Sequence, residues 1–129
     1  MVPVKKIMTK EVLMINEKTS IKEVASMMKT KKIGSILVEK NNEVIGIVTE
    51  ADIVRRLVAE ERDPNTTLVK TIMSSPLLTI DAEMSIIDAN DMMDKNRVRH
   101  LAVKEEGKIV GLVSCRDVMH PIYMEGEEW

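Results

Sequence analysis

The chain has 129 residues, of which 44% are hydrophobic and 31% charged, and its formal net charge is −2. This is the composition of a globular protein, long enough for one compact domain or for two small ones that share a core. The absence of a basic excess argues against binding to nucleic acid or to an anionic membrane. No apolar run approaches the roughly 20 residues of a membrane span. The N-terminus lacks the apolar stretch of a secretion signal, and the lone Cys115 cannot form an internal disulfide, so we expect a cytoplasmic location.

The sequence repeats itself at an offset of 65 residues. Residues 4–55 align with residues 69–120 without a gap, and 14 of the 52 pairs are identical. A polar stretch with a helix-stopping proline separates the copies and is typical of a linker. We therefore predict a first repeat at residues 1–60, a linker at 61–68, a second repeat at 69–122 and an acidic tail at 123–129.

Each repeat begins with a short β-rich run, at residues 12–15 and 77–80. A helix then starts at Ser20 or Ser85, each followed three residues later by an acidic residue in the pattern of a capping box. Apolar residues recur at helical spacing after both starts, which predicts one buried face per helix. In the first repeat this stripe consists of Ile21, Val24, Ala25 and Met28, and in the second of Ile86, Ala89 and Met93, interrupted by Asn90.

Two β-branched runs follow in each repeat, around the polar pairs Asn41-Asn42 and Glu106-Gly107. Such pairs between apolar runs predict hairpins, with strands at 36–39 and 44–48, then at 101–104 and 109–113. A second helix begins at Thr49 or Ser114. The chain is thus predicted to be α+β, with the order β-α-β-β-α occurring twice. A unit this small leaves faces of its sheet and helices exposed unless its twin covers them, so we expect the repeats to pack together.

The last strand of each repeat ends in Gly-φ-φ-[Ser/Thr]-x-x-Asp-φ, where φ is apolar, at residues 46–53 and 111–118. A carboxylate accepts paired hydrogen bonds from the two hydroxyls of a ribose, so Asp52 and Asp117 are candidate ribose anchors. The hydroxyls of Thr49 and Ser114 face the same helix entrances, where backbone N–H groups favour phosphate. The same spacing also forms a helix capping box, and the residues alone leave both interpretations open.

This motif, repeated in register, resembles the cystathionine β-synthase (CBS) domain. Further pieces are similar to that family: Ile7-Met8, Ile72-Met73-Ser74 with Pro76, the Ser-Ile helix starts, and residues 99–103. The resemblance covers about residues 3–120 and implies a stand-alone pair of CBS repeats, a Bateman module, packed with pseudo-two-fold symmetry. It implies a regulatory, signal-transducing module whose clefts between repeats bind AMP, ADP, ATP or S-adenosylmethionine, with no other cofactor required.

In the family, one repeat supplies the groups that bind ribose and phosphate, and the other supplies apolar residues around the base. Carried over to this chain, the resemblance implies two clefts. The main cleft would contain Met8, Leu13, Ile33, Arg99, His100, Ser114, Arg116 and Asp117. The second cleft would contain Gly34, Ser35, Thr49, Ala51, Asp52, Met73, Leu78 and Val98. The apolar members of both sets are equally explained as ordinary core.

Arg99 and His100 replace Gly34 and Ser35 of the first repeat. Neighbours on a strand point to opposite faces, so side-chain direction suits one of the pair to the cleft unless the strand bends. Arg99 is the better phosphate ligand because it is always charged and can donate two parallel hydrogen bonds. The alternative for His100 is a surface or interface position. The remaining cations near the first repeat are interpreted as solvated helix faces: Lys29, Lys31, Lys32, Arg55 and Arg56.

No catalytic set is visible: the sequence has no cluster at metal-ligand spacing, no glycine-rich phosphate loop and no nucleophile beside a base. We therefore expect no enzyme and no metal. Three hypotheses remain: a module that binds an adenosyl ligand, a ligand-free interaction module, and an enzyme acting on nucleotides. The family also forms dimers through helices, so we expect a homodimer and an unidentified regulated protein. The candidate residues of the dimer interface are apolar: Ile53, Val54, Leu57, Val58, Val118, Met119 and Ile122.

Overall fold

The computed structural model describes residues 1–119, and the predicted tail and Ile122 lie outside these residues. The chain divides into two compact units. The first-repeat unit consists of residues 13–77, and the second-repeat unit of residues 1–12 together with the chain from residue 78 onward. The matching sequence repeats and the compact units are therefore different sets of residues.

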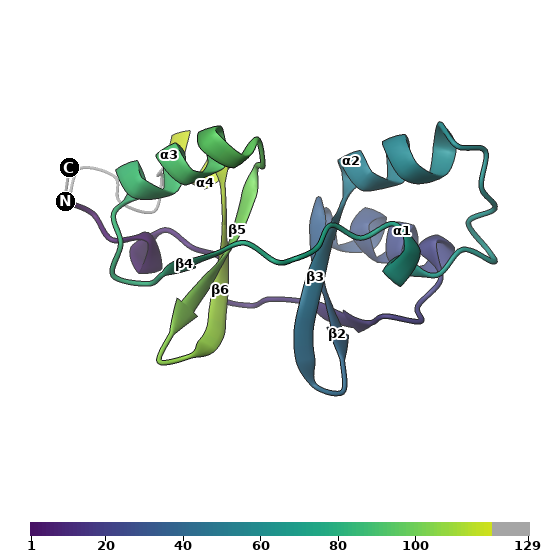
Figure 1. The fold of residues 1–129 in the computed structure, drawn as a ribbon, viewed down its shortest axis with the longest axis horizontal. Coiled ribbons are helices and arrows are strands. Elements are labelled where there is room, and N and C mark those ends of the chain that lie inside the picture. Colours follow the sequence, from purple (N-terminus) through teal and green to yellow (C-terminus); the bar gives the residue numbers. More distant parts are fainter. Residues whose placement is uncertain (120–129) are drawn as a thin grey trace. The chain divides into compact units, whose positions relative to one another are not determined.

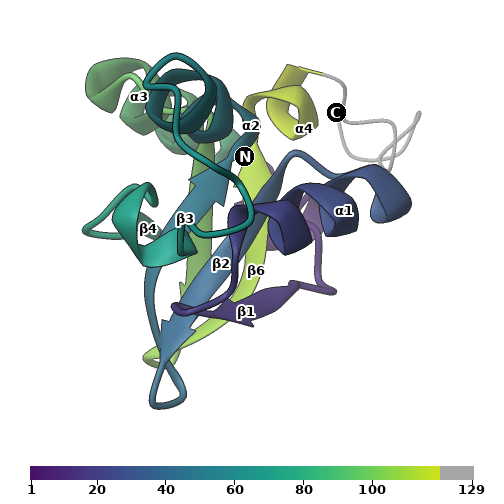
Figure 2. The ribbon, with the colours of Figure 1, turned by 90° about the vertical axis from the view of Figure 1, so that its right-hand side faces the viewer.

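The first-repeat unit contains β1 (Met14–Asn16), α1 (Ile21–Lys31), β2 (Ser35–Lys40), β3 (Glu43–Thr49) and α2 (Glu50–Ile53). A π-helical stretch, η2 (Val54–Val58), continues α2, and a short 3₁₀ turn, η3 (Val69–Thr71), follows the linker. The sheet has the order β1-β2-β3, with β1 parallel and β3 antiparallel to β2. Figure 2 shows this sheet from a direction in which its three strands can be followed separately.

The second-repeat unit has the same plan. It contains the 3₁₀ turn η1 (Val4–Lys6), then β4 (Thr79–Asp81), α3 (Ile86–Asn96), β5 (His100–Glu105), β6 (Lys108–Ser114) and α4 (Cys115–Met119). Its sheet has the order β4-β5-β6, again with one parallel and one antiparallel pair. In each unit the hairpin turn lies at one end of the long strands and the helices lie toward the other (Figure 1). The predicted order β-α-β-β-α and the α+β class are confirmed, although β1 begins two residues after the predicted start of its run.

Local chemistry accounts for these elements. Both hairpin turns place two successive residues at positive φ: Asn41 at 51° and Asn42 at 66°, then Glu106 at 51° and Gly107 at 78°. This is the backbone of a type I′ turn, whose twist matches that of the strands. Ser20 Oγ accepts the Glu23 N–H at the start of α1, and the predicted stripe residues Ile21, Val24 and Met28 are buried. In α3 the corresponding buried residues are Ile86, Ala89 and Met93.

Each unit has its own aliphatic core, completed by a segment that precedes the first strand of the other repeat in sequence. Val4 and Ile7 of the N-terminal segment are buried in the core of the second-repeat unit. Val69 and Ile72 are buried in the core of the first-repeat unit. Figure 1 shows the purple N-terminal turn beside β4 and α3, and the teal η3 beside α1. The repeats have thus exchanged their leading segments.

Backbone hydrogen bonds hold each exchanged segment against the last strand of its unit. Thr9 and Leu112 bond reciprocally at 2.8 and 3.0 Å, and Ser74 and Ile47 do so at 2.8 and 3.1 Å. The motif glycines permit this approach. A Cβ atom on Gly46 would lie 2.7 Å from the Ser74 carbonyl oxygen, and one on Gly111 would lie 2.8 Å from that of Thr9. The glycine of Gly-φ-φ therefore has a packing role in both units.

None of the helices within residues 1–119 has the length and apolarity needed to cross a membrane.

Candidate functional site

The two helix entrances that follow β3 and β6 have the same hydrogen bonds. At the first, Asp52 Oδ2 accepts the Thr49 backbone N–H at 2.9 Å and the Thr49 hydroxyl at 3.1 Å, while the Asp52 N–H donates to Thr49 Oγ1. At the second, Asp117 Oδ2 accepts the equivalent pair from Ser114 at the same distances. The capping interpretation, left open by the residues, is thus confirmed at both motifs. Capping uses one oxygen of each carboxylate. The hydrogen bonds of the other oxygen depend on the residues around it.

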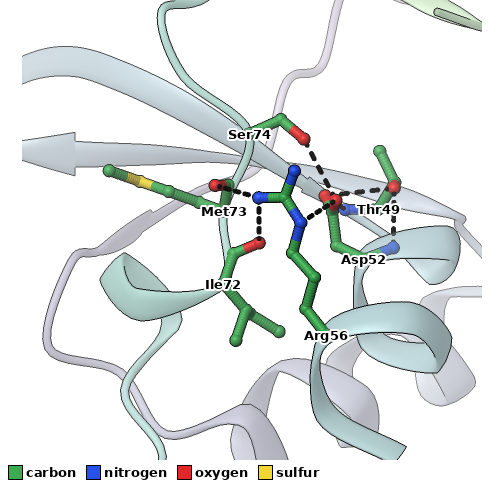
Figure 3. A network of polar contacts seen from close by, with 6 residues as sticks. All are labelled: Thr49, Asp52, Arg56, Ile72, Met73 and Ser74. Atoms are coloured by element: carbon green, nitrogen blue, oxygen red, sulfur yellow. Dashed lines mark hydrogen bonds and ion pairs between the residues drawn. The ribbon is translucent and has the colours of Figure 1, made fainter. Parts of the chain in front are cut away.

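Asp52 has further partners on its second oxygen (Figure 3). Ser74 Oγ donates to Asp52 Oδ1 at 3.0 Å, and the Nε of Arg56 lies 3.8 Å from the same oxygen. Arg56 Nη1 also donates to the carbonyl oxygens of Ile72 and Met73, at 3.2 and 3.0 Å. Asp52 is 6% exposed, the one polar residue within the buried set of residues 1–119. It therefore joins α2 to the exchanged segment 72–74.

Asp117 has a different environment. Its side chain is partly exposed, and within the described part of the chain no donor reaches Asp117 Oδ1. Thr9 is the counterpart of Ser74 at the 65-residue offset, but its side chain is exposed and makes no hydrogen bond to Asp117. The second carboxylate oxygen of Asp117 therefore accepts no hydrogen bond from residues 1–119.

The first residue of β2 is paired with the last residue of β3 at the first entrance, and that of β5 with the last residue of β6 at the second. Ser35 pairs with Thr49, and His100 pairs with Ser114, in the two antiparallel ladders. Directly paired residues point to the same face of a sheet, so His100 shares a face with Ser114. Arg99 precedes the strand, and its carbonyl oxygen accepts the Cys115 N–H at 3.0 Å.

The two entrances differ in charge. In the first-repeat unit, Glu50 opens α2, and its carboxylate lies against Gly34, where an added Cβ would clash with it. The corresponding residue in the second-repeat unit is the neutral Cys115. Arg99 and Arg116 are exposed and make no ion pair with other described residues. The entrance at Asp117 thus has one carboxylate and two arginines, Arg99 and Arg116. The entrance at Asp52 has two carboxylates, those of Asp52 and Glu50, and one arginine, Arg56.

The structure brings together six of the eight predicted residues of each cleft within one unit. Leu13 and Ile33 of the main set belong to the first-repeat unit, and Leu78 and Val98 of the second set belong to the second-repeat unit. The pairing of these four with the opposite carboxylate stays a prediction. All of the apolar candidates pack beside the core of their own unit, as the core alternative expects: Met8, Leu78 and Val98 in one, Leu13, Ile33 and Met73 in the other. Ala51 is exposed on the first turn of α2.

Sequence reasoning missed three residues of the first-repeat site. Ser74 belongs to the Ile72-Met73-Ser74 run, whose pattern indicates no partner for its hydroxyl, and no motif of the sequence singles out Glu50. The interpretation of Arg56 as a solvated helix face is incomplete: its side chain is 53% exposed, but its guanidinium binds the exchanged segment. Its spacing of four residues from Asp52 was the available signal, since residues at i and i+4 are neighbours on a helix. Residues 1–119 contain no cluster of His, Cys, Asp and Glu able to hold a metal ion.

Known proteins share the sequence and fold of this chain. The chain is similar to the CBS domain-containing protein YhcV of Bacillus subtilis, with 33% identity over 115 residues, covering 89% of this chain and 81% of YhcV. It spans 50% of the length of another curated relative. The fold matches the crystal structure of an uncharacterized conserved protein from Pyrococcus horikoshii with a TM-score of 0.91 and 29% identity, covering 99% of this chain and 97% of that one.

A second solved structure is the hexameric CBS-CP12 protein from bloom-forming cyanobacteria, with a TM-score of 0.86 and 29% identity. It covers 92% of this chain and 70% of that one. The CBS domain family itself matches twice, over residues 4–59 and 69–123. With two matches that together span most of its length, a shared fold and the motif at both helix entrances, this chain belongs to the CBS domain family and contains a tandem pair of its domains.

Proposed function

We propose that the chain is a regulatory module that binds an adenosyl ligand, AMP, ADP, ATP or S-adenosylmethionine, mainly at Asp117, and that it catalyses no reaction. Proteins with CBS domains are generally regulatory modules. The observation that carries the proposal is the state of Asp117: one oxygen caps α4, and the other accepts no hydrogen bond from the described residues. Two ribose hydroxyls match an oxygen with this acceptor capacity.

The charges around the Asp117 entrance favour an anionic ligand. Arg99 and Arg116 are exposed, and His100 is paired with Ser114 on the neighbouring strand. Arginine binds phosphate through parallel hydrogen bonds, and a hydrogen bond to a charged group contributes about 1.5–3 kcal/mol. The entrance at Asp52 has Glu50 instead, whose carboxylate repels phosphate. A phosphorylated nucleotide is therefore expected at Asp117 in preference to Asp52.

Calorimetry and thermal unfolding test the proposal directly. AMP, ATP, S-adenosylmethionine and adenosine are titrated separately into the purified protein. A ligand present at 100 times its dissociation constant stabilises the native state by about 2.7 kcal/mol, which raises the melting temperature visibly. If no adenosyl compound at millimolar concentration gives binding heat or a melting shift, the proposal is wrong.

A second candidate function is a ligand-free module for self-association or partner docking. Val54 and Val58 are 59% and 63% exposed on the helix that follows β3, and Met119 is 70% exposed at the end of α4. The related CBS-CP12 protein is hexameric, which supports self-association of this chain. Leu57, in contrast, is 4% exposed and packs in the core of the first-repeat unit, so it is not a candidate for the dimer interface.

Light scattering distinguishes the two functions when it is combined with calorimetry. We expect a homodimer at tens of micromolar, and Val54→Glu with Val58→Glu should shift it toward monomer because charges replace the exposed apolar surface. Asn42→Asp, on the hairpin turn, serves as a control for added charge. A homodimer without any adenosyl binding would favour the interaction module.

The single cysteine and the absence of a predicted catalytic set support a reducing cytoplasm and a non-enzymatic role.

A further inference from the structure

The two motif carboxylates differ in the number of acceptor positions that remain unused. An ionised carboxylate offers about four, two on each oxygen. Asp117 Oδ2 receives two hydrogen bonds, from the Ser114 backbone and hydroxyl, and Oδ1 receives none from the described residues. Within the described part of the chain, two positions therefore remain, both on one oxygen.

Asp52 has fewer. Its Oδ2 receives the equivalent two hydrogen bonds from Thr49. Its Oδ1 already accepts the Ser74 hydroxyl at 3.0 Å, and the positively charged Arg56 lies 3.8 Å away on the same side (Figure 3). One acceptor position remains, on a residue that is 6% exposed. A vicinal diol donates two hydrogen bonds, so it cannot bind this carboxylate in full while Ser74 keeps its own.

The donor that fills Asp52 comes from the exchanged segment and not from the helix entrance. Ser74 is 22 residues from Asp52 in sequence and is positioned by its backbone ladder with Ile47. Arg56 binds the carbonyls of Ile72 and Met73 and so keeps the same segment in place. In the second-repeat unit the equivalent residue, Thr9, also has a hydroxyl, but this is exposed and does not reach Asp117. The difference lies in the side-chain placement and not in the chemistry of the hydroxyl.

We propose that Ser74 is an internal competitor that determines ligand selectivity between the two sites, because its hydroxyl occupies the Asp52 oxygen that a ribose diol needs. The inference rests on the proposed function and adds to it the residue that weakens the first-repeat site. Binding of a diol to Asp52 through both hydroxyls and the Ser74 hydrogen bond exclude each other, so such binding weakens the docking of segment 72–74. By linkage, loss of the Ser74 hydroxyl strengthens diol binding at Asp52.

The test measures adenosine binding by calorimetry in an Asp117→Ala background, which removes the main site. Adenosine is chosen because it lacks phosphate, so the repulsion from Glu50 does not enter. Adding Ser74→Ala should tighten adenosine binding about tenfold, since one competing hydrogen bond to a charged group is removed. Ser74→Thr retains a hydroxyl and should leave the affinity of the background unchanged. Ser75→Ala is the matched control on the neighbouring exposed residue.

Two further measurements assign the gain to the carboxylate. With 2′,3′-dideoxyadenosine the tenfold gain should vanish, because the ligand has no diol. Adding Asp52→Ala to the Ser74→Ala variant should also abolish it. Circular dichroism establishes that each variant is folded, and Ser74→Gly replaces Ser74→Ala, with the same expected gain, if the alanine variant does not fold.

The outcomes separate the two proposals. If the wild-type protein binds an adenosyl ligand but removal of the Ser74 hydroxyl leaves adenosine affinity unchanged, Ser74 is not a competitor and only this inference is overturned. An equal gain with the dideoxy ligand also overturns it. If neither the wild-type protein nor the Ser74 variants bind any adenosyl compound, the proposed function and this inference both fail.

Discussion

Asp52 and Asp117 occupy equivalent positions in two copies of one motif and make the same cap at the start of a helix. Beyond the cap they differ. Asp52 is buried and joined to Ser74 and Arg56, whereas Asp117 is partly exposed and keeps one oxygen without a donor from the described residues. The comparison teaches that a repeated motif specifies local geometry, while its availability for function depends on residues supplied from elsewhere in the chain. One copy is an anchor of the fold, and the other is the proposed ligand site.

The largest expected effect is on stability. Asp52→Ala removes a cap and leaves the partly buried Thr49 and Ser74 hydroxyls without their acceptor, and we expect it to lower the free energy of unfolding by about 3 kcal/mol. Asp117→Ala removes only a cap and should cost about 1 kcal/mol. Urea unfolding of both variants measures the difference. Equal losses in the two variants would contradict the larger contribution of Asp52 to stability.

The second prediction concerns ligand affinity and has the opposite order. Asp117→Ala should weaken AMP binding by about 100-fold, because the ribose loses two hydrogen bonds to a charged acceptor. Asp52→Ala should leave the tight site largely intact, provided that the variant is folded. Calorimetry at a temperature well below both unfolding transitions makes the measurement. The reverse result would mean that the two sites have been assigned the wrong way round.

The third prediction separates charge from ribose recognition. Arg99→Ala should weaken AMP binding about tenfold and hardly change adenosine binding, because adenosine has no phosphate. Arg55→Ala is a matched control, since Arg55 is exposed on the other unit and has no partner among the described residues. The AMP affinity of the wild-type protein should also fall with added salt. An equal loss for AMP and adenosine would assign Arg99 a structural role instead.

The smallest effect is expected at the two counterpart hydroxyls of the exchanged segments. Ser74→Ala removes one hydrogen bond to a buried carboxylate and should lower the free energy of unfolding by about 1 kcal/mol. Thr9→Ala changes an exposed side chain and should remain within about 0.5 kcal/mol of the wild type. Thermal and urea unfolding provide the measurement. A Thr9 effect as large as that of Ser74 would contradict the asymmetry between the units.

The parts of this fold that could be predicted from sequence are those governed by neighbours along the chain. Helix starts at Ser20 and Ser85 follow from a hydroxyl and an acidic residue three positions apart, and the hairpin at Asn41-Asn42 follows from two residues that tolerate positive φ. The contact of Ser74 with Asp52 spans 22 residues, and no local pattern encodes it. The same applies to the exchange of leading segments, because the 65-residue repeat predicts equivalent positions and not the unit in which a segment packs.

The candidate site follows the same division. The motif correctly indicated a carboxylate and a hydroxyl together at each helix entrance, because three residues separate them on one turn. The ligand role of these groups and the apolar residues assigned to each cleft stay predictions. The spacing of Arg56 from Asp52 indicates one partner in the sequence, whereas its other partners are backbone carbonyls, which have no signature there.

The exchange of leading segments has a consequence for how this protein can be divided. A fragment cut at the sequence repeat, residues 1–60, would contain α1 and its sheet but lack Val69 and Ile72, which are fully buried beside them. Two such half-chains would regain complete cores only by lending their first segments to each other, as a domain-swapped pair does. In the tandem chain the linker makes this reciprocal exchange intramolecular. The segment that completes each core is therefore always present at high effective concentration. Duplication and fusion of a swapped half-length dimer would produce this connectivity, and residues 13–77, rather than 1–60, are the piece to express alone.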